Sequence, residues 1–149
     1  MSKVAVFTDK APKPRRVYSQ AIVANGFVFC SGQIPKDLSG KIVEGTVEDR
    51  THQCIANLKA VLEAAGSSLN DVVEVNVFLS DMGDFAKMNK VYEQYWGEVK
   101  PARTCVAVKT LPDHTDVEIK CVGLVRQVID ARLTIVQGSH YPDYPNDQT

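Results

Sequence analysis

The sequence has almost no excess charge and no long apolar segment, and both absences narrow the class of protein. Among its 149 residues, 17 Lys and Arg face 18 Asp and Glu, which gives a formal net charge of −1. Such a balance creates no field that attracts nucleic acid or an anionic membrane. The chain has no Lys/Arg run beyond residues 10–16. No segment approaches the roughly 18 consecutive apolar residues of a membrane-spanning helix. We therefore expect neither a nucleic-acid nor a membrane partner.

Familiar catalytic motifs are also missing. The chain contains no G-x-x-x-x-G-K-[ST], G-x-G-x-x-G, H-E-x-x-H or G-x-S-x-G sequence. Its three histidines, His52, His114 and His140, are scattered over a predicted helix, a loop and the C-terminal stretch. That scatter argues against a metal cluster and against a histidine-based triad. We expect no metal site.

The cysteines and the N-terminal residues bear on the cellular compartment. Cysteines occur at positions 30, 54, 105 and 121, none in a C-x-x-C pair. Three lie in apolar runs, so we expect buried, reduced thiols rather than a disulfide framework. The first sixteen residues have no apolar segment of a secretory signal. Asp9 and two prolines interrupt any transit-peptide pattern. These features predict a cytoplasmic protein, and a mitochondrial location stays open.

Hydrophobic patterning predicts the element order β-β-α-β-α-β-β. Asn25-Gly26 between apolar residues indicates a hairpin of strands 21–24 and 27–31, followed by a loop over 32–45. A helix over 47–65 begins at the N-cap Thr46 and ends at Gly66. A strand over 72–80, a helix over 84–96 and strands over 103–108 and 116–125 complete the pattern.

This order predicts one α+β domain with two layers, a sheet on one side and two helices on the other. We expect residues 1–127 to form the domain and 128–149 to be a C-terminal extension that is partly flexible. A further short strand around 133–136 is an open alternative.

Three polar residues stand out inside the last two predicted strands. Period-2 geometry puts Arg103 and Cys105 on one face of their strand. If the two strands are antiparallel neighbours, Glu118 joins them on that side. A guanidinium matches a carboxylate with two parallel hydrogen bonds, and a glutamate can take and return protons around a water. This set could therefore hold and hydrolyse a small acid.

Ordinary structural roles remain open for the same residues. An Arg–Glu pair across two strands is commonly a plain salt bridge, and Cys105 has no basic partner nearby in sequence, which favours a packing role. Tyr18 could be an aromatic residue at the sheet edge, Ser31-Gly32 a turn at a strand end, and Asn89 a solvated helix residue.

Six collinear blocks of the sequence resemble the Rid (YjgF/UK114) family. The match extends over residues 14–126, and no single block would be specific. The blocks are Tyr18-Ser19-Gln20-Ala21, the stretch 29–35 around Ser31-Gly32-Gln33, 57–69, 77–82, Lys100-Pro101-Ala102-Arg103-Thr104-Cys105-Val106, and Val117-Glu118-Ile119.

The resemblance implies a chorismate-mutase-like α+β fold and a homotrimer with a barrel-like core. It implies substrate clefts at the subunit interfaces, and hydrolysis of enamines and imines such as 2-aminoacrylate, 2-iminopropanoate and 2-iminobutanoate. The products would be 2-keto acids and ammonia, and no cofactor would be used. Two related alternatives stay open: an endoribonuclease or translation inhibitor, and a non-catalytic metabolite-binding or chaperone-like member.

Carried over residue by residue, the resemblance implies a role for each matched position. Arg103 would bind the substrate carboxylate, helped by the backbone amide of Cys105, and Glu118 would position or activate water. The remaining cleft positions would be Tyr18, Ser31, Gly32 and Asn89. Two features depart from the family's pattern: Thr104 beside the arginine, which is a mild change, and more than twenty residues after Arg126. The extension leaves the substrate range open.

Overall fold

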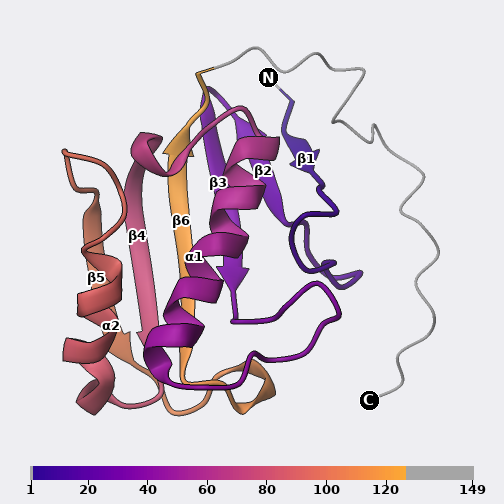
Figure 1. Ribbon diagram of the computed structural model, residues 1–149. Coiled ribbons are helices and arrows are strands. Elements are labelled where there is room, and N and C mark those ends of the chain that lie inside the picture. Colours follow the sequence, from indigo (N-terminus) through magenta and orange to yellow (C-terminus); the bar gives the residue numbers. More distant parts are fainter. Residues whose placement is uncertain (1, 127–149) are drawn as a thin grey trace.

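A six-stranded mixed sheet covered on one face by two helices makes up the described part of the protein, residues 2–126 in a computed structural model (Figure 1). The strand order is β1-β2-β3-β6-β4-β5. The strands are β1 (Val4–Val6), β2 (Ala21–Ala24), β3 (Phe27–Gln33), β4 (Val72–Leu79), β5 (Ala102–Ala107) and β6 (Val117–Leu124). The helices are α1 (Val47–Ala64) and α2 (Phe85–Tyr92). The predicted α+β class is confirmed.

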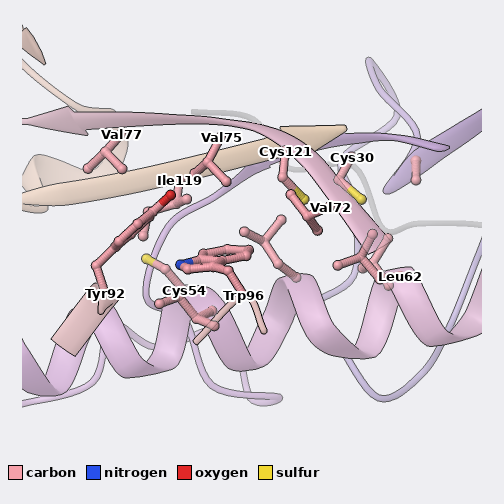
Figure 2. Packing of buried hydrophobic residues seen from close by; sticks show 14 of the residues in the cluster. Cys30, Cys54, Leu62, Val72, Val75, Val77, Tyr92, Trp96, Ile119 and Cys121 are labelled. Carbon is pink, nitrogen blue, oxygen red and sulfur yellow. The ribbon is translucent and has the colours of Figure 1, made fainter. Parts of the chain in front are cut away.

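The core lies between the helices and the inner face of the sheet (Figure 2). Alternate residues of β4 and β6, such as Val75, Val77 and Ile119, are fully buried there. They meet the apolar stripe of α1, including Leu58 and Leu62. Burying each such side chain contributes about 1.5–3 kcal/mol, so this layer supplies much of the fold's stability.

Local sequence signals account for the first hairpin and the first helix. Asn25 and Gly26 both have positive φ, 51° and 80°, as a tight two-residue hairpin turn requires. At α1, the Thr46 hydroxyl accepts a hydrogen bond from the Asp49 amide, and the Asp49 carboxylate accepts one from the Thr46 amide. This reciprocal capping box fixes where the helix begins. Gly66, with φ 76°, follows its end.

The structure departs from the predicted elements most clearly at the N-terminus and at the end of the second helix. Strand β1 was not predicted, since three residues are too few to show a clear alternation. Helix α2 ends at Tyr92 rather than at residue 96, and Trp96 has a left-handed backbone with φ 79°. The buried Trp96 indole packs 5.1 Å from the Tyr92 ring centroid. The apolar spacing continues through Tyr95, which packs against the core from the turn after the helix, so the pattern overestimated the helix length.

The pairing expected for the last two strands was wrong. β5 pairs in parallel with β4, and β6 pairs antiparallel with β4, so β4 separates the two strands. The α2 crossover carries the chain from β4 to the sheet edge, as parallel pairing requires. The predicted extension over 128–149, with its alternative strand around 133–136, lies outside the described residues.

Candidate active site

An open pocket of about 400 Å³ lies beside the start of β6, at the end of β3. Segments far apart in the sequence line it: the N-terminal loop, the end of β3, and the loop before β6. Its lining includes four of the predicted site residues, Tyr18, Ser31, Gly32 and Glu118. The structure therefore brings these four together.

Glu118 is the half-buried acid of this pocket. Burial raises the pKa of its carboxyl group above the usual value. The carboxylate lies over Gly32, and a Cβ added to Gly32 would come within 2.1 Å of Glu118 Oε1. Glycine at position 32 is thus required for the place that the carboxylate occupies.

Tyr18 and Ser31 lie on a wall that a buried glutamine supports. Gln20 is 1% exposed. Its amide nitrogen donates hydrogen bonds to the carbonyl oxygens of Thr8 (3.0 Å) and Pro12 (2.9 Å), and its amide oxygen accepts one from the Thr8 amide (2.8 Å). These bonds hold the N-terminal loop against β2. The Ser31 hydroxyl donates a hydrogen bond to the Ser19 carbonyl oxygen at 2.5 Å. The Ser31 oxygen can still accept a hydrogen bond.

A charged cluster of Arg15, Lys36 and Asp113 closes another side of the pocket. Lys36 Nζ lies 2.5 Å from Asp113 Oδ2, and an Arg15 nitrogen lies 3.9 Å from Asp113 Oδ1. The hydrogen bond from Lys36, followed by the charges of Lys36 and Arg15, lowers the pKa of Asp113 below its usual value. Asp113 therefore stays ionised and ties the loop before β6 to both cations.

Arg103 lies on β5 under α2, away from this pocket. One of its terminal nitrogens donates a hydrogen bond to Asn89 Oδ1 at 2.6 Å. The guanidinium carbon lies 4.6 Å from the Tyr92 ring centroid and 5.6 Å from that of Phe85. Cation–π contacts and the Asn89 bond hold the group in place. Within residues 2–126 no carboxylate forms an ion pair with Arg103.

Cys105 shares the face of Arg103 and is half-buried. Burial raises the pKa of its thiol, and the Arg103 charge lowers it by a smaller amount. The thiol is therefore neutral at physiological pH, which disfavours it as a nucleophile. The other three cysteines, Cys30, Cys54 and Cys121, are buried free thiols, as expected.

The predicted residues thus form two groups on opposite faces of the sheet. Arg103 and Cys105 pair with the inner-face residues Val75 and Val77, whereas Glu118 pairs with Phe78 on the outer face. Because residues paired across strands share a face, Arg103 and Glu118 of one chain point to opposite sides. The expected cluster of Arg103, Cys105 and Glu118 within one chain was wrong.

The sequence reasoning missed the residues that shape the pocket. The sequence presents Gln20 only as part of a family block, because its burial and its hydrogen bonds to the N-terminal loop follow from the fold. Lys36 lies in a loop and Asp113 in the short 3-10 helix Pro112–His114, where no periodicity guides a prediction. Lys13 and Arg15 belong to the basic run 10–16, and that run was the available signal.

No group of three His, Cys, Asp or Glu side chains within residues 2–126 could hold a metal ion. None of the helices in this part of the chain is both long and apolar enough to cross a bilayer.

Comparison with known proteins identifies the family. The profile of the family described as Endoribonuclease L-PSP matches residues 8–125. The chain belongs to this family, which includes the Rid proteins. A RutC family protein of Pyrococcus horikoshii is 54% identical over 122 residues, 81% of this chain and 97% of that protein. The mitochondrial protein mmf1 of Schizosaccharomyces pombe is 57% identical over 110 residues, 72% of this chain and 67% of that protein.

One similar solved structure contains a bound small molecule. TdcF of E. coli, crystallised with bound serine, superimposes with a TM-score of 0.76 at 35% identity, covering 80% of this chain and 97% of TdcF. The fold of this Rid-family chain is the expected chorismate-mutase-like α+β arrangement. The serine shows that TdcF binds a small amino acid.

Proposed function

We propose that this Rid-family protein hydrolyses small 2-imino and 2-enamino acids to 2-keto acids and ammonia. The observation that carries the proposal is the state of Arg103. Its guanidinium is fixed by Asn89 and two aromatic rings, yet it has no carboxylate partner within residues 2–126. A held, unneutralised guanidinium suits a ligand carboxylate. The serine bound by the relative TdcF carries the same carboxylate and adjacent nitrogen as the proposed substrates.

We further propose that the complete site forms between copies of the chain in a homotrimer. Arg103 and Glu118 cannot meet within one chain, because the sheet separates them. Two features support association. β5 is the edge strand beyond β4 (Figure 1). The outer face of the sheet also exposes large apolar side chains, including Phe29 (47% exposed) and Val106 (42%), as interface surfaces do.

In the proposed reaction, Arg103 of one copy binds the substrate carboxylate and orients the imine carbon. Glu118 of a neighbouring copy removes a proton from water as the oxygen bonds to that carbon. Glu118 returns that proton to the substrate nitrogen, which gives a carbinolamine. The hydroxyl proton of the carbinolamine is then transferred to the same nitrogen, the C=O bond forms as the C–N bond breaks, and ammonia leaves. The C=N bond is replaced by a C=O bond at the same oxidation level, so imine and water become keto acid and ammonia without oxidation or a cofactor. Glu118 acts as base and then acid.

The other predicted residues have supporting roles in this proposal. The backbone amide of Cys105 would help bind the carboxylate, and Asn89 would orient Arg103. Tyr18, Ser31 and Gly32 would line the side that holds Glu118. The neutral thiol of Cys105 takes no covalent part.

Substitution of Arg103 tests the anchor. A dehydratase that forms 2-aminoacrylate from serine supplies the substrate, and pyruvate formation is followed against the uncatalysed rate. Arg103→Ala should lose the acceleration by about 100-fold or more, since a charge-assisted pair contributes about 1.5–3 kcal/mol and orientation adds to it. Arg126→Ala removes an exposed arginine paired with Asp71 and is the matched control. Full activity of Arg103→Ala would refute the anchor.

Mixed assemblies test whether two chains build one site. Arg103→Ala and Glu118→Gln chains are assayed separately, then refolded together in equal amounts. Each alone should be nearly inactive. In the mixture, about a quarter of the sites should combine an intact arginine with an intact glutamate, which restores a comparable share of the activity. Absence of recovery in mixed oligomers, verified by mass spectrometry, would contradict a site shared between copies.

RNA cleavage by the same preparations would favour the ribonuclease alternative.

A further inference from the structure

The pocket that holds Glu118 has more room and more positive charge than a three- or four-carbon acid needs. Its volume of about 400 Å³ lies within the range of roughly 300–1,000 Å³ found for much larger ligands. Three cations, Lys13, Arg15 and Lys36, line it together with two carboxylates, Asp113 and Glu118. Of these five charged residues, the reaction proposed above uses only Glu118.

The charges of this pocket are unevenly balanced. Lys36 is neutralised by Asp113 at 2.5 Å, while Arg15 makes only a loose contact with the same carboxylate at 3.9 Å and is 64% exposed. Lys13 forms no ion pair with any of residues 2–126. The uncompensated positive charge therefore lies at Lys13 and Arg15, which we call the basic end.

The backbone of the basic end is held in place. Lys13 lies between Pro12 and Pro14, and the two rings restrict the local backbone to extended conformations. The Pro12 carbonyl accepts the hydrogen bond from the buried Gln20 amide at 2.9 Å. Pro14 is buried. A ligand group that binds here meets a cation on an ordered segment, so little backbone order is lost on binding.

We propose that the pocket prefers 2-imino acids that carry a second carboxylate, bound by Lys13 and Arg15. This proposal rests on the function proposed above, in which Arg103 of a neighbouring copy binds the first carboxylate. The second carboxylate cannot lie at Glu118, because two like charges repel. It lies at the basic end, and the reacting carbon lies between the two anchors. The preferred substrates are the imines of acidic amino acids.

Binding of two keto acids of equal chain length measures this preference. 2-Oxoglutarate carries the second carboxylate, and 2-oxopentanoate has a methyl group in its place. Calorimetry gives the two dissociation constants at low salt. The wild-type protein should bind 2-oxoglutarate about threefold to tenfold more tightly, as expected for a carboxylate bound by partly exposed cations. The preference should shrink at about 0.5 M salt, where such charges are screened.

A double substitution tests whether Lys13 and Arg15 cause the preference for 2-oxoglutarate. Lys13→Gln/Arg15→Gln should bring the ratio of the two constants close to one. Lys10→Gln removes a positive charge from the same basic run but from a residue that does not line the pocket, and it should keep the wild-type ratio. All three substituted residues are exposed, so the variants should fold.

Each outcome bears on the proposal. Equal affinities in the wild-type protein, or an unchanged ratio in the double variant, would overturn it. If the wild-type protein still accelerates hydrolysis of 2-aminoacrylate in that case, the proposed function stands and only the acidic preference fails. If neither keto acid binds and no acceleration is seen, both fail.

Discussion

Glu118 is positioned by the absence of a side chain across from it. Gly32 leaves the space in which the carboxylate lies, and burial there raises the pKa of the acid. As a base, Glu118 acts when ionised. The rate at limiting substrate should therefore rise with pH through a pKa that lies above the usual carboxyl value. Glu118→Gln should remove this acidic limb of the profile.

Gly32→Ala tests the position of the Glu118 carboxylate without a large change in the stability of the fold. The new methyl group meets Glu118 Oε1, the end of a flexible side chain, so the carboxylate should move toward water and the fold should change little. We expect kcat/KM to fall about 10- to 100-fold. The acidic limb should shift to lower pH, since the displaced acid is less buried. Gly83→Ala, which adds a methyl group 3.1 Å from Asp81, is the control. An unchanged pH profile in Gly32→Ala would contradict this role.

At the scale of elements, a bidentate ion pair between Arg50 and Asp116 joins α1 to the residue that precedes β6. Arg50 Nε and Nη2 donate to the two carboxylate oxygens of Asp116 at 2.8 and 2.7 Å, and Nη1 donates to the Gly45 carbonyl. Asp116 directly precedes β6. Both side chains are about one-fifth exposed, 20% and 21%. The pair therefore fixes the start of the strand that carries Glu118.

Arg50→Gln should lower the free energy of unfolding by about 1–3 kcal/mol, because it leaves a partly buried carboxylate unpaired. Lys59→Gln, which breaks the exposed Lys59–Glu63 pair, should cost less than about 0.5 kcal/mol. Urea denaturation at one protein concentration compares the two variants. Equal losses would show that Arg50 contributes no more than a surface pair.

How far the sequence predicts the fold differs between elements. Thr46 and Asn25-Gly26 act through contacts within a few residues, so α1 and the hairpin were predicted from them. The position of β5 depends on pairing with β4 across the α2 crossover, and alternation within β5 is the same whichever strand lies beside it. Hence the site residues were predicted by resemblance, but their separation across the sheet was not.

For the whole molecule, the outer face of the sheet should be the contact between copies. Val106→Glu puts a charge on this face, where burial without a partner costs several kcal/mol. We expect the assembly to dissociate, with activity lost alongside. Leu38→Glu, at a residue 66% exposed in the loop between β3 and α1, should change neither. Analytical ultracentrifugation measures the mass. A trimer retained by Val106→Glu would exclude this face as the contact.

Because β5 lies at the edge of the sheet, catalysis under the proposed arrangement depends on association of the copies. A single folded chain carries its cationic anchor and its acid on opposite faces of the sheet. Under the proposed arrangement, such a chain is inert toward substrate, and the rate per chain falls as dilution separates the copies. Encounter between copies would then complete the catalytic site.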